Sequence, residues 1–442
     1  MHVRIEDRNP DGRGRGRAAK RVVLVSQAHP GEEVTVRTDL VTRGTVQGRV
    51  AKLLERDPAR IEHECQHEFH CTGCPLLAAS EEDEAAFKTA RLAHALESLR
   101  GYTLPAPEPL LRPGPLFGYR HLAKQSFGER EGHAVLGSYV AGTHRVTDNA
   151  GCPVLAPPLR DLMDLVARLA DESGLPLDAP NGRSGLRHAV ARLSRSSGRM
   201  LLLIGTTEDP PLGASALAGL LRRECPDLVG VHVLVQSGRG NALLAGDVRW
   251  SDGASFVEDA ILGFTHRIGP RSFFQIHPAA AEVMFATAVA AAGEGERCLE
   301  VFAGVGALTL PLASCFREVV AIESSTEASV SLREAAARVS RTSGRVQVRE
   351  GRAEVLVPEA LRVSTPDVVV LDPPRAGASP AVMEPIAASG ARRCILISCD
   401  PDALARDLAP LLRSDWVVER IVPVDQFPRT AHLETIAVAS RR

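Results

Sequence analysis

The stretch from Cys394 to Pro401 constrains the fold of this chain more than any other. Its first residues are apolar and predict a buried strand that ends at Ser398 and Cys399. Pro401 cannot donate to a strand ladder and disfavours helix at Asp400, so a turn and then a helix are expected. Open α/β sheets bind ligands at the carboxyl edge of such strands. Cys399 is therefore a candidate nucleophile, because a helix N-terminus favours a thiolate; a buried structural cysteine is the alternative.

A second predicted strand, residues 298–301, runs into a loop that contains Gly304 and Gly306. The missing Cβ atoms allow a cofactor to approach the backbone. A third strand ends in Glu323, which is placed to accept hydrogen bonds from ribose hydroxyls. Thr309 stands where the dinucleotide fingerprint has its third glycine, and this favours S-adenosylmethionine over NAD.

Two carboxylates complete the predicted site. Asp372 ends another apolar strand and precedes two prolines, although an ordinary stiff turn would look the same. Glu434 leads a strand near the end of the chain and can face the same cleft. A thiolate and a carboxylate beside a methyl donor suit methylation of uracil C5, because attack at C6 activates C5 and a base then removes the C5 proton. An amino-group methyltransferase could use Asp372 and Arg375, but it would need neither Cys399 nor Glu434.

A cysteine cluster lies in the first third of the chain. Cys65, Cys71 and Cys74 follow a C-x5-C-x2-C pattern, and Cys152 lies downstream. Four thiolates suit a [4Fe–4S] cluster or a tetrahedral zinc ion, and spacing separates these poorly. A third interpretation is that these are loop cysteines that bind no metal. Zinc stays open because histidines lie nearby, at His63, His67 and His70. The odd total of nine cysteines argues for thiol or metal chemistry over a disulfide framework.

The N-terminal region is basic, although the net charge of the chain is −2. Residues 1–60 contain 13 Lys and Arg against 8 Asp and Glu. Residues 1–19, with an Arg-Gly repeat, are expected to form a disordered basic arm. Residues 20–60 predict a small β-barrel, a fold that often binds oligonucleotides. Four interleaved basic residues fit that use, or a solvated sheet face: Arg37, Arg43, Arg49 and Lys52.

The remaining segments predict a scaffold. Residues 81–100 read as an amphipathic helix, and residues 156–264 as alternating helices and strands without a motif. No run of about 18 apolar residues and no secretory signal is visible, so we expect a cytoplasmic protein.

Together these motifs resemble the RNA (uracil-5-)-methyltransferase family over nearly the whole chain. The matching residues are Phe273-Phe-Gln275, Glu300-x-Phe302-x-Gly304-x-Gly306, Glu323, Asp372-Pro-Pro-Arg375, Ser398-Cys399-Asp-Pro and His432-x-Glu434. Residues 20–60 resemble the TRAM domain of the family's bacterial ribosomal-RNA members. The four clustered cysteines match the iron–sulfur ligands of those members.

The resemblance implies an α/β protein with a class I (Rossmann-like) methyltransferase domain at 266–442. It also implies a TRAM-like barrel at 20–60 and a central α+β domain at 61–265 that carries a [4Fe–4S] cluster, with helices near 83–111 packed on the catalytic domain. Cys399 would be the nucleophile and Glu434 the C5 base. S-adenosylmethionine would be contacted by Gln275, Phe302, Gly304, Gly306, Glu323 and Asp372.

The implied partner is RNA, with 23S ribosomal RNA expected as the substrate of a monomeric enzyme. The cluster would be structural or would position RNA. Transfer RNA as substrate, and a non-catalytic RNA-binding paralogue, are the alternatives. Three positions depart from the family, which usually has Asn where this chain has His277, Ala307 and Asp400. Ala307 removes a cofactor hydrogen bond worth about 0.5–1.5 kcal/mol, and Asp400 is expected to raise the pKa of Cys399.

Overall fold

The structure is a computed structural model that describes residues 1–140, 143–178, 184–236, 243–339 and 344–442. These residues form two compact units, and neither is one continuous stretch of sequence. Unit 1 comprises Met1–Glu84, Pro115–Val257 and Pro428–Ala431, and unit 2 comprises Ala85–Gly114, Glu258–Phe427 and His432–Arg442.

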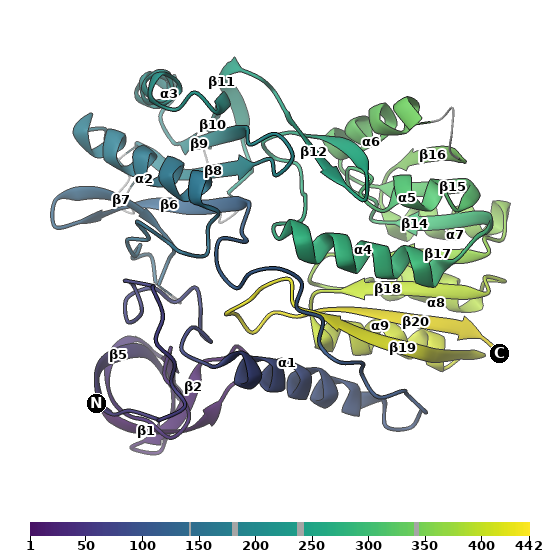
Figure 1. Ribbon diagram of the computed structural model, residues 1–442, viewed down its shortest axis with the longest axis horizontal. Coiled ribbons are helices and arrows are strands. Elements are labelled where there is room, and N and C mark those ends of the chain that lie inside the picture. Colours follow the sequence, from purple (N-terminus) through teal and green to yellow (C-terminus); the bar gives the residue numbers. More distant parts are fainter. Residues whose placement is uncertain (141–142, 179–183, 237–242, 340–343) are drawn as a thin grey trace. The chain divides into compact units, whose positions relative to one another are not determined.

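Unit 1 begins with a closed β-barrel whose strands run in the order β1-β2-β3-β5-β4 (Figure 1). Antiparallel pairing of β1 with β4 closes it. Alternate residues point inward and form an apolar core that includes Val3, Ile5, Val23 and Val25. The predicted barrel is therefore confirmed. Its strands are β1 (His2–Arg8), β2 (Gly14–Ala18), β3 (Arg21–Ser26), β4 (Glu33–Val41) and β5 (Thr45–Glu55).

Residues 1–19 are not a disordered arm, and that prediction was wrong. They supply β1 and β2, and the Arg-Gly repeat is the two-residue alternation of β2. Its glycines face the buried side and its arginines face outward. Glycine is required inside, because a Cβ at Gly16 would lie 2.2 Å from the carbonyl oxygen of Arg4 and one at Gly14 would lie 2.7 Å from that of Ala28.

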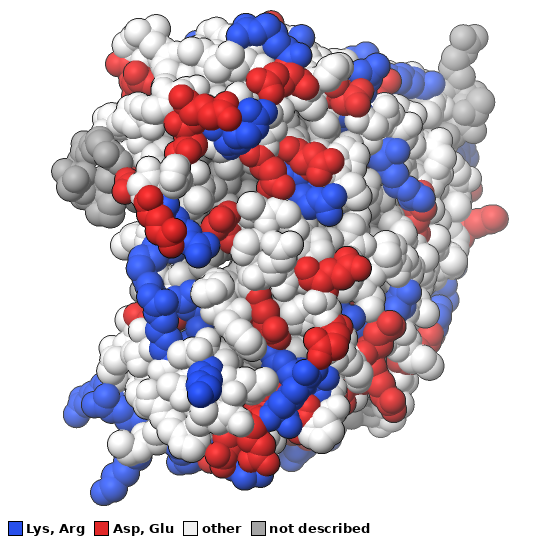
Figure 2. Space-filling model, turned by 60° about the vertical axis from the view of Figure 1, so that its left-hand side comes forward, with Lys and Arg blue, Asp and Glu red and all other residues white. Residues whose placement is uncertain are grey.

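The basic residues of the barrel divide into two groups. Arg37, Arg43 and Lys52 are exposed, as an RNA-contacting role requires. Arg49 is buried: its Nε donates to Asp39 Oδ2 at 2.8 Å and its Nη1 donates to the carbonyl oxygen of His70 at 2.8 Å. Arg49 is thus a structural residue. Lys and Arg side chains alternate with Asp and Glu over the face shown in Figure 2, so this face is of mixed charge.

The second part of unit 1 is a six-stranded sheet in the order β11-β10-β9-β8-β6-β7. Apolar residues of α2 and α3 share one core with this sheet, which confirms the helices and strands predicted between residues 156 and 264. The elements are β6 (Leu122–Arg130), β7 (His133–Gly137), α2 (Pro157–Glu172), β8 (Leu186–Leu193), β9 (Met200–Thr206), α3 (Leu212–Glu224), β10 (Leu228–Val235) and β11 (Asp247–Gly253).

Unit 2 contains a seven-stranded sheet in the order β16-β15-β14-β17-β18-β20-β19. The first five strands are parallel, and β20 runs antiparallel to β18 and β19. The chain leaves β14 toward β15 on one side and returns beside β14 as β17, so the topological switch point lies at β14. The strands are β14 (Gly295–Val301), β15 (Phe316–Glu323), β16 (Arg345–Glu350), β17 (Val368–Leu371), β18 (Arg393–Ser398), β19 (Trp416–Val424) and β20 (Glu434–Arg441).

Helices flank this sheet, as a doubly wound fold requires (Figure 1). They are α4 (Pro278–Ala292), α5 (Thr309–Ala313), α6 (Thr326–Val339), α7 (Ala353–Val363), α8 (Pro380–Ala388) and α9 (Pro401–Leu412), and the hairpin β12 (Val257–Ile261) and β13 (Phe264–Ile268) precedes them. Leu92, Leu96 and Leu99, from α1 (Glu81–Leu96) and the 3₁₀ turn η1 (Glu97–Leu99), join the core of unit 2. No helix among the described residues is long and apolar enough to cross a membrane.

Candidate active site

The predicted site residues of unit 2 come together because their strands end at one edge of the sheet. Val301 of β14 pairs with Ile322 of β15 and with Leu371 of β17, and Leu371 pairs with Leu396 of β18. The residues that follow these pairs therefore emerge side by side. They include Phe302, Glu323, Asp372 and Cys399.

The loop after β14 is shaped to receive a ligand. Phe302, Gly304 and Gly306 all have positive φ angles, of 66°, 57° and 94°. A non-glycine residue in this region costs about 1–3 kcal/mol, so Phe302 is strained at this point. A Cβ at Gly306 would lie 2.3 Å from Leu332, whereas a Cβ at Gly304 would meet nothing within 4 Å. Gly306 thus serves the packing of the loop, and Gly304 leaves open space before its backbone.

Glu323 is bonded to this loop, and Gln275 is bonded to a second glutamine. Glu323 accepts a hydrogen bond from the backbone N–H of Gly304 at 2.9 Å through Oε2, and one from Ser325 at 2.6 Å through Oε1. Gln275 is buried, and its Oε1 accepts from Gln426 Nε2 at 2.8 Å. Acceptor oxygens beside an open glycine backbone fit the ribose and amino-acid parts of S-adenosylmethionine.

Burial raises the pKa of two carboxyls near this loop. The pKa of Glu300 rises to about 8, and the pKa of Asp372 rises to about 7. Thr309, in place of a third glycine, is buried at the start of α5. Both carboxyls are poised to change charge near neutral pH.

Cys399 and Glu434 are brought together by the pairing of β18 with β20. Ser398 pairs with Thr435. Cys399 directly follows Ser398 and Glu434 directly precedes Thr435, so both residues lie at the same end of the antiparallel pair. Glu434 is buried, and burial and then the nearby Asp372 raise its pKa well above the usual range. Such a carboxylate is a stronger base than an exposed one.

The Cys399 thiol is held mainly in its neutral form. Its pKa rises to about 12 because of burial, and then because of the charge of Glu434; Asp372 and Asp400 add to the effect, and Arg375 opposes it. The predicted direction of the Asp400 effect is confirmed, but burial and Glu434 matter more. Arg375 Nη2 lies 2.8 Å from His432 Nε2, and burial followed by Arg375 lowers the pKa of His432 to about 4.

Two of the three departures from the family pattern have a local structural role. His277 is the N-cap of α4, where its Nδ1 accepts from the N–H of Ala280 at 3.4 Å. Asp400 is the N-cap of α9, where its Oδ1 accepts from Asp402 at 3.1 Å and Ala403 at 3.0 Å. Asn and Asp are equally good caps, so Asp400 conserves the helix start while it adds a charge. Ala307 is the third departure, and its methyl side chain can neither donate nor accept a hydrogen bond.

The high pKa of Cys399 gives a measurable pH dependence. Below the pKa the thiolate fraction rises about tenfold for each pH unit, and only the thiolate reacts. We expect the rate of Cys399 alkylation by iodoacetamide in the folded protein to rise about tenfold from pH 7 to 8 and again from pH 8 to 9, without a plateau. Mass spectrometry of the Cys399 peptide measures this rate. Denatured protein is the control, and a plateau below pH 8 in the folded protein would contradict the assignment of a raised pKa.

The four cysteines predicted to bind a cluster line one cavity in unit 1. Cys65, Cys71, Cys74 and Cys152 surround it, together with Gln27, His67, Leu77, Asn149, Pro153 and Val154. Burial raises the pKa of Cys65 and Cys74 and brings that of Cys71 to about 11; the neighbouring thiols add to this. Bound metal ions would stabilise the thiolate forms of these cysteines and so lower their pKa values.

The cavity does not have the geometry of a single-ion site. In the part of the chain that the structure describes, no group of three or more His, Cys, Asp or Glu side chains is arranged to hold one metal ion. His63 Nε2 lies 3.1 Å from Glu68 Oε1, and His67 Nε2 lies 2.5 Å from the carbonyl oxygen of Ala150. Both histidines have partners of their own, so the four thiols are the candidate metal ligands of this cavity.

Sequence reasoning missed the residues that act through long-range pairs. Gln426 bonds Gln275, and Arg91 of α1 pairs with Asp400 at 3.1 Å between Nη2 and Oδ2. Lys88 Nζ donates to Asp425 Oδ1 at 2.7 Å, with both side chains buried. No local pattern marks Lys88 as buried, because Glu84 and Arg91 lie one helical turn away on the same face.

Comparison with known proteins agrees with this geometry. A family model described as tRNA (Uracil-5-)-methyltransferase matches residues 257–442, and a TRAM domain model matches residues 1–51. An uncharacterized RNA methyltransferase of Gloeobacter violaceus is 32% identical over 426 residues, which cover 95% of this chain and 92% of that protein. One of Nostoc sp. is 30% identical over 444 residues, 99% of this chain and 95% of that protein.

A solved structure shares the fold over the same length. The Pyrococcus abyssi tRNA (uracil-54, C5)-methyltransferase in complex with S-adenosyl-L-homocysteine superimposes with a TM-score of 0.77. The two chains are 22% identical, and the match covers 99% of each.

Proposed function

Because this chain belongs to the RNA (uracil-5-)-methyltransferase family, we propose that it methylates C5 of a specific uridine in RNA through a covalent bond between Cys399 and C6. The methyl donor of the family is S-adenosylmethionine, and the open loop at Gly304 and the acceptor Glu323 are the features that would hold it. We propose that the enzyme acts in the cytoplasm and as a monomer.

The side chains divide the chemistry between them. The Cys399 thiolate attacks C6, and the C5=C6 electron pair shifts toward O4 so that C5 becomes an enolate-like carbon. S-adenosylmethionine would supply the methyl group that C5 takes up, with cleavage of its bond from sulfur to the methyl carbon and release of S-adenosylhomocysteine. Glu434 then accepts the C5 proton, the C5=C6 double bond re-forms, and the bond between C6 and sulfur breaks to return the thiolate.

The observation that carries the proposal is the pairing of Ser398 with Thr435. It places a thiol and a buried carboxylate together at the edge of the sheet where the glycine loop also opens. A methyltransferase that modifies an amino group needs no such pair. Incubation with RNA and labelled methyl donor, followed by nucleoside analysis, tests the proposal. We expect 5-methyluridine, whereas a methylated amino group as product would reject it.

The expected substrate is large-subunit ribosomal RNA. The support for this choice is the resemblance of the TRAM-like barrel and of the four cysteine positions to the ribosomal members of the family. Transfer RNA is the alternative, because the Pyrococcus abyssi tRNA (uracil-54, C5)-methyltransferase shares the fold over 99% of this chain. The exposed Arg37, Arg43 and Lys52 would add sequence-independent contacts to phosphates.

The substrate prediction is tested with RNA from cells that lack this protein. We expect methyl transfer to 23S ribosomal RNA, and at least tenfold less to transfer RNA under the same salt conditions, because a specific site exceeds non-specific binding by about 10³ or more. Methylated transfer RNA with unmodified ribosomal RNA would favour the alternative substrate.

We also propose that Cys65, Cys71, Cys74 and Cys152 bind a [4Fe–4S] cluster. The support is that the four thiols line one cavity and that the four positions match the family's iron–sulfur ligands. The cluster lies in unit 1, whereas Cys399 and Glu434 belong to unit 2. Its role in this proposal is to hold the two cysteine-bearing loops together and to position RNA.

The cluster prediction has a direct readout. Protein purified without oxygen should be brown and contain about four iron atoms per chain, as a [4Fe–4S] cluster requires. Cys74→Ser should lose the iron and lower the melting temperature of unit 1. Cys225→Ser, at a cysteine outside the cavity, is the control and should keep the iron. A colourless protein with one equivalent of zinc would contradict the prediction.

A further inference from the structure

Asp400 follows the proposed nucleophile directly, and both of its carboxylate oxygens are engaged. Oδ1 accepts hydrogen bonds from the first backbone N–H groups of α9, those of Asp402 and Ala403. Oδ2 lies 3.1 Å from Nη2 of Arg91, which reaches it from α1 within unit 2. The carboxylate is thus fixed between a helix N-terminus and a guanidinium group.

The two capping hydrogen bonds of Asp400 do not require its charge, although the dipole of α9 favours a negative group there. An asparagine at this position would accept the same two hydrogen bonds, so the aspartate adds only a negative charge. Cys399 already faces the carboxyls of Glu434 and Asp372, and each of these disfavours its thiolate. A third negative charge beside the thiol would slow formation of the nucleophile unless it is offset.

Arg91 is placed to offset this charge. Its side chain is 16% exposed and that of Asp400 is 33% exposed, so the pair is less screened than an ion pair on the open surface. The field of Arg91 also reaches His432, together with the fields of Arg375, Lys88 and Asp400. Arg375 is the cation whose charge directly favours the Cys399 thiolate, so Arg91 would act through Asp400.

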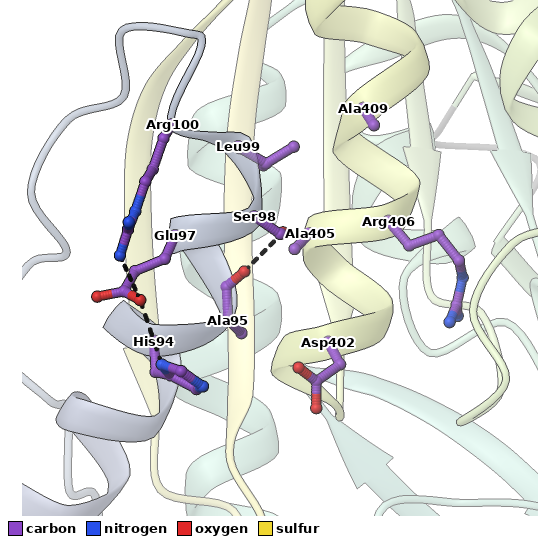
Figure 3. A pocket seen from close by; sticks show the side chains of 10 residues that line it. All are labelled: His94, Ala95, Glu97, Ser98, Leu99, Arg100, Asp402, Ala405, Arg406 and Ala409. Atoms are coloured by element: carbon purple, nitrogen blue, oxygen red, sulfur yellow. Dashed lines mark hydrogen bonds and ion pairs between the residues drawn. The ribbon is translucent and has the colours of Figure 1, made fainter.

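Neighbouring charges on the same helices are engaged elsewhere. Figure 3 shows the groove between α1–η1 and α9, of about 700 Å³. Glu97 lies within ion-pair distance of Arg100, at 2.7 Å, and of His94, at 3.3 Å, and Arg406 donates to the carbonyl oxygen of Ala376. Arg91 is therefore the side chain of α1 that meets Asp400.

We propose that Arg91 is a positioning residue for the nucleophile: it holds the Asp400 carboxylate at the start of α9 and offsets its charge, so that this chain can carry Asp after Cys399. This role rests on the proposed function of Cys399. It assigns Arg91 and Asp400 as a matched pair in which Arg91 is needed because Asp400 is charged.

A double-mutant cycle tests the pair through the reactivity of the Cys399 thiol. The variants are Arg91→Gln, Asp400→Asn and the two combined, and the rate of Cys399 alkylation is followed against pH in the full-length protein. We expect Arg91→Gln to slow alkylation about two- to tenfold at a given pH, and Asp400→Asn to accelerate it. In the Asp400→Asn background, Arg91→Gln should change the rate less than twofold.

The controls separate charge from structure. Arg100→Ala, at an exposed arginine of the same helical segment, should leave the alkylation profile unchanged. Arg91→Lys should retain most of the wild-type rate. If Arg91→Gln slows alkylation equally in both backgrounds, or not at all, the proposal is rejected. If Arg91→Gln folds poorly, two other comparisons of the alkylation rate test the proposal. One compares Arg91→Lys with wild type, and the other compares the double variant with Asp400→Asn. The readout needs no RNA, so it stays valid even if Cys399→Ala retains methylation and the proposed function fails.

Discussion

Cys399→Ala should abolish both RNA methylation and covalent capture of RNA that carries 5-fluorouridine at the target. The thiolate is needed before methyl transfer, because C5 of uracil gains nucleophilicity only after addition at C6. With fluorine at C5, the wild-type protein should transfer the methyl group and then stall, since Glu434 cannot remove fluorine as it removes a proton. A protein–RNA species that survives denaturing electrophoresis measures this capture.

Cys394→Ala is the matched control for this experiment. Cys394 lies in the same strand, and burial raises its pKa to about 12, as for Cys399. It lies inside the core, so its removal should affect stability and leave capture intact. A uridine in a loop or bulge should react better than a paired one, because the base must leave its stack to meet the thiol. Methylation by Cys399→Ala at the wild-type rate would leave Cys399 as a core cysteine.

The strand ends of unit 2 could be predicted because each follows an apolar run that ends at a polar residue, a glycine or a proline. Cys399, Asp372 and Glu323 each end or follow a buried strand, and parallel strands bring such residues to one edge. The side-by-side arrangement of Cys399 and Glu434 follows from the same logic, although the antiparallel direction of β20 cannot be read from its composition.

The N-terminal barrel shows where composition misleads. Arginine and glycine are common in disordered arms, so the Arg-Gly repeat predicts one. In β2 the same repeat satisfies the strand period of two, with glycine where the barrel wall has no room for a Cβ. The signal was the strict alternation, which compositional reasoning ignores.

The pairs that support the site could not be predicted because they join distant parts of the chain. Arg91 and Asp400 are 309 positions apart, and Gln275 and Gln426 are 151 apart. Local patterns do not determine which of many arginines will meet a given carboxylate. The tertiary fold determines these pairs, because each joins residues that lie far apart in the sequence.

Glu434→Gln should separate the two halves of the reaction. Glutamine retains the size of the side chain but cannot accept the C5 proton, so turnover should fall about 10²- to 10⁴-fold. Addition and methyl transfer precede the step that needs the base. The variant should therefore accumulate a covalent adduct with ordinary uridine, which wild type releases.

The same substitution should make the thiol more reactive. Glu434 is the largest charged contributor to the raised pKa of Cys399, so its neutral replacement should speed alkylation of Cys399 at pH values above the raised pKa of Glu434, where the carboxylate is charged. Faster alkylation together with a trapped adduct would assign the carboxylate to proton removal and exclude a role in activating the thiol. If Glu434→Gln instead releases 5-methyluridine at the wild-type rate, another group takes the C5 proton. Asp372, whose pKa rises to about 7 at the same edge, is then the carboxyl to test.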